Sequence, residues 1–273
     1  MDLDLRLREQ CEALVARSGS EQPFGTYVVA SNDPAAEIGR EVERMVFGEF
    51  FGNTPEMLAA EYAPYEPASI FLCVIDQRRL VPAGVSRVIV SSDAGFKSLH
   101  DITRVWGRAP DDLIARSGSA LDLRSCRDIA TLATANDYRG KGTEGLVSLA
   151  LYQAIIMSSI MTNAPWLVAV MDVAVIDLLS ERIGSPFSRY PDVQPERYLD
   201  SPASLPVYVD LPGYGNRLAG KDEAMHEILF RGTGLEDAVR TPDWSTETFG
   251  AIEALALPAQ TDSVTAARSA GRS

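Results

Sequence analysis

A glycine-rich segment in the middle of the chain has the residue types and spacing of an anion-binding loop. It reads NDYRGKGTEG, with Gly140, Gly142 and Gly145 in the order G-x-G-x-x-G and Arg139 directly before the first glycine. Glycines let the backbone approach an anion closely, and the first N–H groups of a following helix point at that anion with the helix dipole behind them. Because Arg139 and Lys141 add positive charge, the segment predicts a phosphate or pyrophosphate site.

Three interpretations of this loop stay open: a cradle for a single pyrophosphate, a dinucleotide loop, and a glycine-rich turn without a ligand. The spacing suits a dinucleotide, and Asp172 ends the next expected strand, where a ribose-binding acid belongs. Such a loop begins within a residue or two of its strand, whereas residues 135–139 intervene here. A Walker loop is excluded, because Gly142 and not Ser or Thr follows Lys141.

The segment DYRGKGTEGLVSLALYQA resembles the Arg/Gln-x-x-Gly-x-Gly/Ala motif of the GCN5-related N-acetyltransferase (GNAT) superfamily. The resemblance covers about residues 25–211 and implies that the loop holds the pyrophosphate of acyl-coenzyme A (acyl-CoA). One departure is that the final Gly/Ala of the motif falls on Glu144, whose carboxylate would repel the anion unless it turned outward. The donor-binding residues implied are the loop residues Arg139, Gly140, Lys141, Gly142, Thr143 and Gly145, together with the main chain of Leu132, Ala133 and Thr134.

The strands before the loop resemble those of autoinducer synthase-like and N-acyl amino acid synthase members of the superfamily. CRDIATLA is similar to their acidic-x-Ser-Arg strand, and EYAPYEPASIFLCV with PAGVSRVIV is similar to their acid-rich turn and Gly-x-x-Arg strand. The likeness puts Asp128 at the acidic position, with Glu66 and Arg87 as substrate-binding residues. Ala130 and Thr131 stand where those relatives have Ser-Arg, so their acceptor chemistry does not carry over.

Acyl transfer from a thioester to an amine needs a base, an oxyanion-stabilising site and a proton donor for the departing thiolate. We expect Asp128 to be the base, because burial on a central strand would raise its pKa from about 3.9; pairing with Arg127 or Arg87 is the alternative role. The superfamily's proton-donating tyrosine falls on Ser180. Either Ser180 acts through water, a tyrosine such as Tyr190 replaces it, or the thiol leaves unaided.

The function favoured by these residues is an N-acyltransferase that moves an acyl group from a phosphopantetheine thioester to the amine of a small molecule or amino acid. Acyl-CoA is the expected co-substrate, and no tightly bound cofactor is expected. An acyl carrier protein is acidic, so its use would need a basic patch around Arg139, Lys141 and Lys97. A non-catalytic acyl-CoA-sensing domain and an NAD(P)-dependent oxidoreductase remain alternatives.

Composition narrows the protein classes. The 273 residues are 46% hydrophobic and 23% charged, as in a soluble globular chain, and the net charge of −13 disfavours nucleic acid and anionic membranes. The three cysteines lack metal spacing and only two histidines occur, which favours reduced thiols and no metal site. The charged start MDLDLRLREQ and the lack of a long apolar run predict neither a signal nor a membrane span, so we expect a cytoplasmic protein.

Hydrophobic periodicity and capping residues predict the elements that position these side chains. Helices are expected at 4–17, from the Asn32-Asp33-Pro34 cap to 51, from the Thr54 cap to 62, and at 143–161, 173–183 and 222–230. Strands are expected at 25–31, 69–76, 83–92, 127–134, 166–171 and 207–211, with a loop over 186–204.

This order predicts a mixed α/β fold with a centrally splayed sheet of the acyl-CoA N-acyltransferase (GNAT) type and helices on both faces. The expected domain spans 23–257, with an insertion at about 93–123. A helical extension at 1–22 precedes it, and the small, polar tail at 258–273 is expected to be disordered. Strands 69–76 and 83–92 look like a hairpin, whereas a doubly wound sheet needs parallel βα units from its start.

Overall fold

The fold is given by a computed structural model that describes residues 3–139, 143 and 145–256. Its helices are α1 (Leu3–Ser18), α2 (Ala36–Phe51), α3 (Pro55–Tyr62), α4 (Lys97–Trp106), α5 (Pro110–Ser117), α6 (Leu146–Met161), α7 (Val173–Ile183), α8 (Leu211–Ala219), α9 (Glu223–His226) and α10 (Trp244–Leu255). Its strands are β1 (Phe24–Ala30), β2 (Ser69–Asp76), β3 (Val81–Ile89), β4 (Cys126–Thr134), β5 (Trp166–Asp172), β6 (Ser188–Arg189), β7 (Glu196–Tyr198), β8 (Ser201–Asp210) and β9 (Val239–Arg240).

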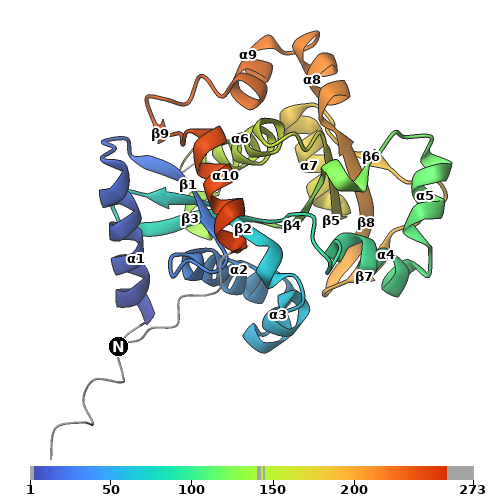
Figure 1. Ribbon diagram of the computed structural model, residues 1–273, viewed down its shortest axis with the longest axis horizontal. Coiled ribbons are helices and arrows are strands. Elements are labelled where there is room, and N and C mark those ends of the chain that lie inside the picture. The colour runs from blue at the N-terminus through green and yellow to red at the C-terminus, as the bar shows by residue number, and fades with distance from the viewer. Residues whose placement is uncertain (1–2, 140–142, 144, 257–273) are drawn as a thin grey trace, which may run out of the picture.

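One sheet runs through the centre of the described chain, in the order β6-β8-β5-β4-β3-β2-β1-β9, with β7 also paired to β8. Strands β1 to β4 are antiparallel neighbours, β4 and β5 are parallel, and β5 and β8 are antiparallel. Figure 1 shows β1–β3 on one side of the molecule and β5–β8 on the other. This antiparallel first half does not match the doubly wound sheet that a dinucleotide loop requires.

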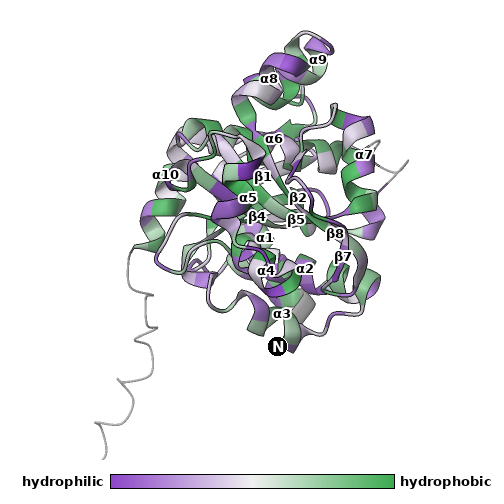
Figure 2. Cartoon of the chain, turned by 90° about the vertical axis from the view of Figure 1, so that its right-hand side faces the viewer, coloured by the Kyte–Doolittle hydropathy of each residue, from purple (hydrophilic) through white to green (hydrophobic). Residues whose placement is uncertain are grey.

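Helices cover both faces of the sheet. Helices α1, α2 and α4 pack on one face, through apolar groups that include Leu14, Ile38 and Ile102. Helices α6, α7 and α10 pack on the other face, around Ile155 and Leu179. The α8–α9 pair projects from the body of the molecule beside α6 (Figures 1 and 2). β4, the strand that carries the predicted base, is therefore central in the sheet and covered on both faces.

Short-range rules account for several helix ends. The Thr54 hydroxyl accepts a hydrogen bond from the Met57 amide at 3.2 Å, as expected for an N-cap with proline behind it. Helix α7 ends at Gly184, whose φ of 83° suits glycine. The prediction for α2 is wrong by two residues, because Asp33 accepts from the Ala35 amide in a turn and the helix begins only at Ala36.

Most expected elements are confirmed, including the β2–β3 hairpin and the order up to α7. The expected loop over 186–204 is partly wrong, since β8 begins at Ser201 and contains Pro202 and Pro206. Prolines are typical of loops, and only the pairing of β8 with β5 shows that this segment is a strand. Helices α8 and α10 and strand β9 were not predicted, and the expected disordered tail lies outside the described residues.

Among the described residues, no helix combines the length and apolarity needed to cross a membrane.

Candidate active site

The sheet divides between β4 and β5. The two strands pair only over Cys126–Asp128 and Trp166–Val168. Beyond that point β4 continues along β3 as far as Thr134, and β5 continues along β8 as far as Asp172, but the described residues form no further ladder between β4 and β5. Main-chain groups on the two facing edges are therefore open to a ligand.

A β-bulge at Ala130 lies where the two strands begin to separate. The register of β4 against β3 shifts there and leaves Ala130 without a partner, while its carbonyl accepts a hydrogen bond from the Tyr62 hydroxyl at 3.3 Å. A bulge re-aims the side chains that follow it. Because of the bulge, Thr131 faces α2 on the same side of the sheet as Asp128, which faces α4, whereas Leu132 faces the α6 side.

The chain passes from β4 to the N-terminus of α6 through the glycine-rich loop. Gly145 caps α6 with a φ of 80°, and a Cβ on it would meet no atom within 4 Å, so the start of the helix faces open space. The Thr143 hydroxyl donates to the Tyr138 carbonyl at 2.8 Å. The predicted ligands Gly140, Lys141 and Gly142, together with Glu144, lie outside the described residues.

Arg139 joins the end of β4 to the start of this loop. Its Nε donates to the Thr134 carbonyl at 2.6 Å, and its guanidinium stacks 4.0 Å from the centre of the Phe50 ring. Burial lowers the pKa of Arg139, partly offset by the charge of Glu49. The guanidinium forms no ion pair with any residue that the structure describes, so its charge is available to an anion at the mouth of the divided sheet.

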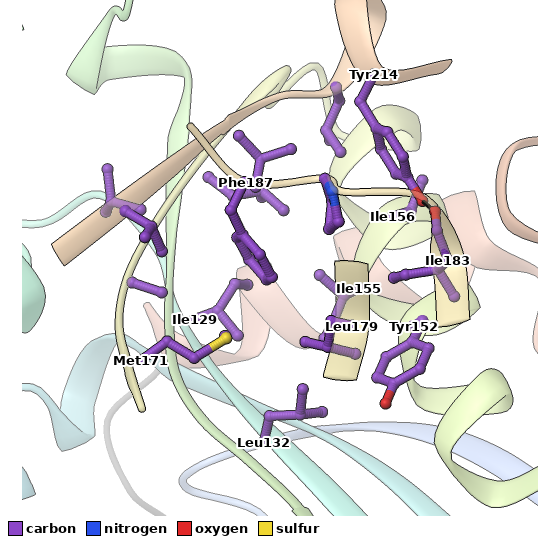
Figure 3. Close-up of a pocket in the computed structure, with 17 residues that line it drawn as sticks. Ile129, Leu132, Tyr152, Ile155, Ile156, Met171, Leu179, Ile183, Phe187 and Tyr214 are labelled. Atoms are coloured by element: carbon purple, nitrogen blue, oxygen red, sulfur yellow. Dashed lines mark hydrogen bonds between the residues drawn. The ribbon is translucent and has the colours of Figure 1, made fainter. Parts of the chain in front are cut away.

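An apolar cavity of about 50 Å³ lies on the α6 side of the gap between β4 and β5 (Figure 3). Leu132 lies at one end of it and Tyr214 at the other. Strands β4, β5 and β8, helices α6, α7 and α8 and the segment between α7 and β6 supply its walls, including Ile129, Tyr152, Ile155, Leu179, Phe187 and Val207. An apolar cavity of this kind suits a short hydrocarbon group and not a charged one.

A polar cavity of about 430 Å³ lies on the opposite, α2 side of β4. Its walls include Arg40, Glu43, Arg44, Tyr62, Glu66 and Arg87. The polar cavity is lined from α2, α3 and Arg87 of β3, so it lies on the α2 face of the sheet, whereas the apolar cavity lies on the α6 face.

No protein-family model matches the chain, and no curated protein matches it. Solved structures do match. FeeM, an N-acyl amino acid synthase from uncultured soil microbes, is 12% identical with a TM-score of 0.52, and the match covers 71% of this chain and 94% of FeeM. BjaI, a CoA-dependent acyl-homoserine lactone synthase in complex with SAM and isopentyl-CoA, is 14% identical with a TM-score of 0.51, covering 85% and 99%. The chain has a GNAT-type, autoinducer synthase-like fold.

Within this GNAT-type fold, Asp128 lies on the paired part of β4 and is fully buried. Its carboxylate accepts from the Ser98 amide at 2.8 Å and the Ser98 hydroxyl at 2.6 Å, in the first turn of α4. Burial raises the pKa of Asp128 to about 6, although the Ser98 hydrogen bonds and the charge of Lys97 act to lower it. The alternative pairing with Arg127 or Arg87 does not occur, and the role of base stays a prediction.

The predicted proton donors, Ser180 and Tyr190, do not line the apolar cavity. The Ser180 hydroxyl donates to the Ile176 carbonyl of its own helix at 2.8 Å. Tyr190 is buried beside Tyr208, and its hydroxyl has no partner among the described residues. The sequence analysis missed Tyr152, which extends from α6 near Leu132 (Figure 3). Its signal is position, since it lies two turns into the helix that the glycine loop opens.

Glu66 and Arg87, which the likeness assigns to substrate binding, contact each other in a network that also contains Glu43. Arg87 donates to Glu43 from Nε at 2.9 Å and from Nη2 at 2.6 Å, and it also pairs with Glu66. Arg40 donates to Glu66 at 2.6 Å, and the Thr131 hydroxyl donates to Glu43 at 2.6 Å. Glu43 was missed, because within α2 it looks like one more charged residue of an amphipathic helix.

The neighbouring arginines keep Glu66 ionised. Burial alone would raise the pKa of Glu66, but the charge and hydrogen bonds of Arg87 and Arg40 outweigh burial and lower it. The Arg87 guanidinium also lies 4.4 Å from the centre of the Tyr62 ring, whose hydroxyl reaches the Ala130 bulge. The network is thereby tied to the point where β4 and β5 separate.

Lys97 does not belong to a surface patch, contrary to the expectation for a carrier-protein site. It is 2% exposed, and its ammonium contacts Glu61 at 2.9 Å, Asp101 at 2.6 Å and the Tyr198 hydroxyl at 2.5 Å. Three partners satisfy its three donors. Lys97 therefore holds α4 to α3 and β7.

Proposed function

We propose that the protein is an N-acyltransferase that moves an acyl group from acyl-CoA to the amine of a small molecule or amino acid. The observation that carries the proposal is the gap between β4 and β5. It opens toward Arg139 and the N-terminus of α6 and lies beside the apolar cavity on the α6 face of the sheet, while a cavity lined by charged side chains lies on the α2 face. A thioester donor has a charged end, an amide-containing arm and an apolar end, and the gap offers a matching surface to each.

The donor lies along the gap, with its pyrophosphate at the glycine-rich loop and its acyl group at the apolar cavity. Its pyrophosphate lies against Arg139 and the first N–H groups of α6, where anions are favoured. Its pantetheine arm follows the open edge of β4 at Leu132–Thr134, whose main chain supplies donors and acceptors. Its acyl group enters the apolar cavity. BjaI, which shares the fold, has been crystallised with isopentyl-CoA.

The acceptor enters from the polar cavity. Glu66 and Glu43 favour an ammonium group, whereas Arg40 and Arg44 at the rim favour a carboxylate, because opposite charges stabilise each ligand group. The acidic and the basic side chains together suit an amino acid, which carries both an ammonium and a carboxylate group. Side-chain exposures of 26% for Arg40 and 27% for Arg44 leave these guanidinium groups within reach of solvent.

The reaction joins the two sides of β4. The amine nitrogen attacks the thioester carbonyl carbon, a C–N bond forms, and the C–S bond breaks with its electron pair moving to sulfur. Asp128, directly or through water, takes the proton that the amine releases, for which a pKa near 6 is suitable. Tyr152 takes the place of Ser180 and gives a proton to the thiolate. Free coenzyme A and the amide are the products.

A non-catalytic acyl-CoA sensor of the same fold is the second candidate. It is favoured by two contacts, since Ser98 occupies the Asp128 carboxylate and the Ser180 hydroxyl bonds within its own helix. Such a domain would bind the donor in the same gap without turning it over.

Donor binding and thiol release separate these functions. A short-chain donor such as acetyl- or propanoyl-CoA should raise the melting temperature, since a ligand held by the native state stabilises it, and thiol should be released with an amino acid panel. Arg139→Ala should weaken donor binding about 10-fold, as expected for one charge-assisted contact. Arg124→Ala, whose side chain is 91% exposed at the far end of β4, is the matched control. Stabilisation without thiol release supports the sensor, and no stabilisation by any acyl-CoA contradicts both.

A further inference from the structure

The apolar cavity ends close to a second cavity. This second cavity, of about 580 Å³, lies where α6 ends and α8 and the π-helix Glu227–Arg231 begin. Leu211 lines both cavities. Ile160 and Phe230 line the second, larger cavity, and no acidic side chain does. Only a few side chains therefore separate the apolar cavity from the second cavity.

Tyr214 forms the largest part of the wall between the two cavities. It is fully buried, lines the apolar cavity at the end opposite to Leu132 (Figure 3), and donates from its hydroxyl to the Ile183 carbonyl at the end of α7. Its other side packs edge-on against Phe230, with ring centres 5.3 Å apart and an interplanar angle of 64°. One tyrosine ring thus contacts the apolar cavity and a wall residue of the larger one.

The position of the ring is fixed by its neighbours. The hydroxyl bond to Ile183 prevents the ring from swinging aside without leaving a buried polar group unpaired. Gly215 follows directly, and a Cβ there would lie 2.9 Å from the Phe230 ring, so only glycine lets Phe230 pack this closely on α8. The wall is consequently rigid, and a chain that reaches it meets a fixed stop.

We propose that Tyr214 ends the acyl subsite and restricts the donor to thioesters of short aliphatic acids. This inference rests on the proposed function and adds the class of acyl group. A cavity of about 150 Å³ accommodates benzene, so one of about 50 Å³ admits a chain of about two or three carbons. Removing the ring would join the two cavities and admit longer chains.

The test compares wild type, Tyr214→Ala and Tyr214→Phe over acyl-CoA donors from acetyl to hexadecanoyl, with kcat/KM measured for each. Because one misfitting methylene in an apolar pocket changes kcat/KM by about 10-fold or more, wild type should lose activity steeply beyond about three carbons. Tyr214→Ala should use decanoyl-CoA at least about 100-fold better than wild type does. Tyr214→Phe keeps the ring and should keep the cutoff.

Melting temperatures with each donor provide a second readout, and Leu211→Ala opens the same wall if Tyr214→Ala does not fold. Equal use of acetyl- and hexadecanoyl-CoA by wild type, or an unchanged cutoff in both wall variants, overturns the inference while leaving acyl transfer intact. Failure of every donor to bind or react overturns the proposed function and the inference with it.

Discussion

The two sides of β4 differ in how completely their groups are satisfied. On the α2 side, Arg87 binds both Glu43 and Glu66; Arg87 and Glu43 have almost no solvent contact, whereas the Glu66 side chain is 30% exposed. On the α6 side, the side chains of α6 and α7 that line the apolar cavity are hydrocarbon apart from Tyr152 and need no polar partner. The buried Arg87–Glu43 pair holds its groups in place, and the unfilled apolar space accepts a hydrocarbon group. The α2 face therefore offers positioned charges, and the α6 face offers an apolar space.

Both sides depart from the most stable packing. Buried ion pairs suffer a desolvation cost that good geometry only partly offsets, and an unfilled cavity loses dispersion contacts. We place acyl transfer at the Ala130 bulge, where β4 and β5 begin to separate. Substitutions on one face of β4 at a time should show whether the two faces contribute independently to stability and activity.

The largest effect is expected on the charged side. Arg87→Ala leaves Glu43 buried without its partner, and the free energy of unfolding should fall by about 3–5 kcal/mol, measured by urea denaturation. Arg116→Ala is the control, since Arg116 forms an exposed pair with Asp192 and should cost less than about 1 kcal/mol. Equal losses in the two variants would contradict a buried network.

A pH-dependent effect is expected from Asp128. Its pKa is raised from 3.8 to about 6 in the fold, so the native state binds the proton more tightly than the unfolded state does. Its contribution to stability is present below pH 4 and is lost as the pH rises through 6, by about 3 kcal/mol in total. Asp128→Asn should remove this part of the pH dependence of unfolding.

The same group should govern activity in the opposite direction. As a base Asp128 acts when ionised, so kcat/KM should fall below about pH 6 and Asp128→Asn should lower it about 100-fold. Unchanged turnover in the variant would show that Asp128 only caps α4 through Ser98.

The smallest effect is expected at the mouth of the apolar cavity. Burial raises the pKa of Tyr152, while a hydrogen bond with Ser148 and the charge of Arg182 lower it. Tyr152→Phe should reduce kcat about 10-fold with acyl-CoA and less with a donor whose thiol is more acidic, because such a thiolate leaves without protonation. Tyr208→Phe removes a hydroxyl on the α4 side and should leave kcat unchanged.

The order of elements was predictable because it depends on local patterns. The apolar run of β2, the Thr54 cap and Gly184 each act within a few residues, and the structure confirms them. Residues brought together by the fold were harder to predict. Glu43 meets Arg87 across 44 positions of sequence, and nothing around Glu43 distinguishes it from the solvent-facing acids of α2.

The sequence could not predict which hydroxyl group reaches the cavity, for a related reason. Counting along the expected helix selects Ser180, but its hydroxyl satisfies a carbonyl of α7 itself. Tyr152 reaches the cavity because α6 lies across the gap between β4 and β5. Which side chain of a helix points into a space depends on how the helix is rotated against the sheet, and packing decides that rotation.

The sequence by itself determined most of the helices and strands up to α7 and placed a candidate acid on a central strand, because periodicity, caps and glycines act over short distances. Tertiary structure alone decided where β4 and β5 part, which groups satisfy Asp128 and Arg87, and which ring closes the apolar cavity. Those outcomes depend on contacts between residues far apart in the chain, whose free energy is set by burial and geometry in the packed state.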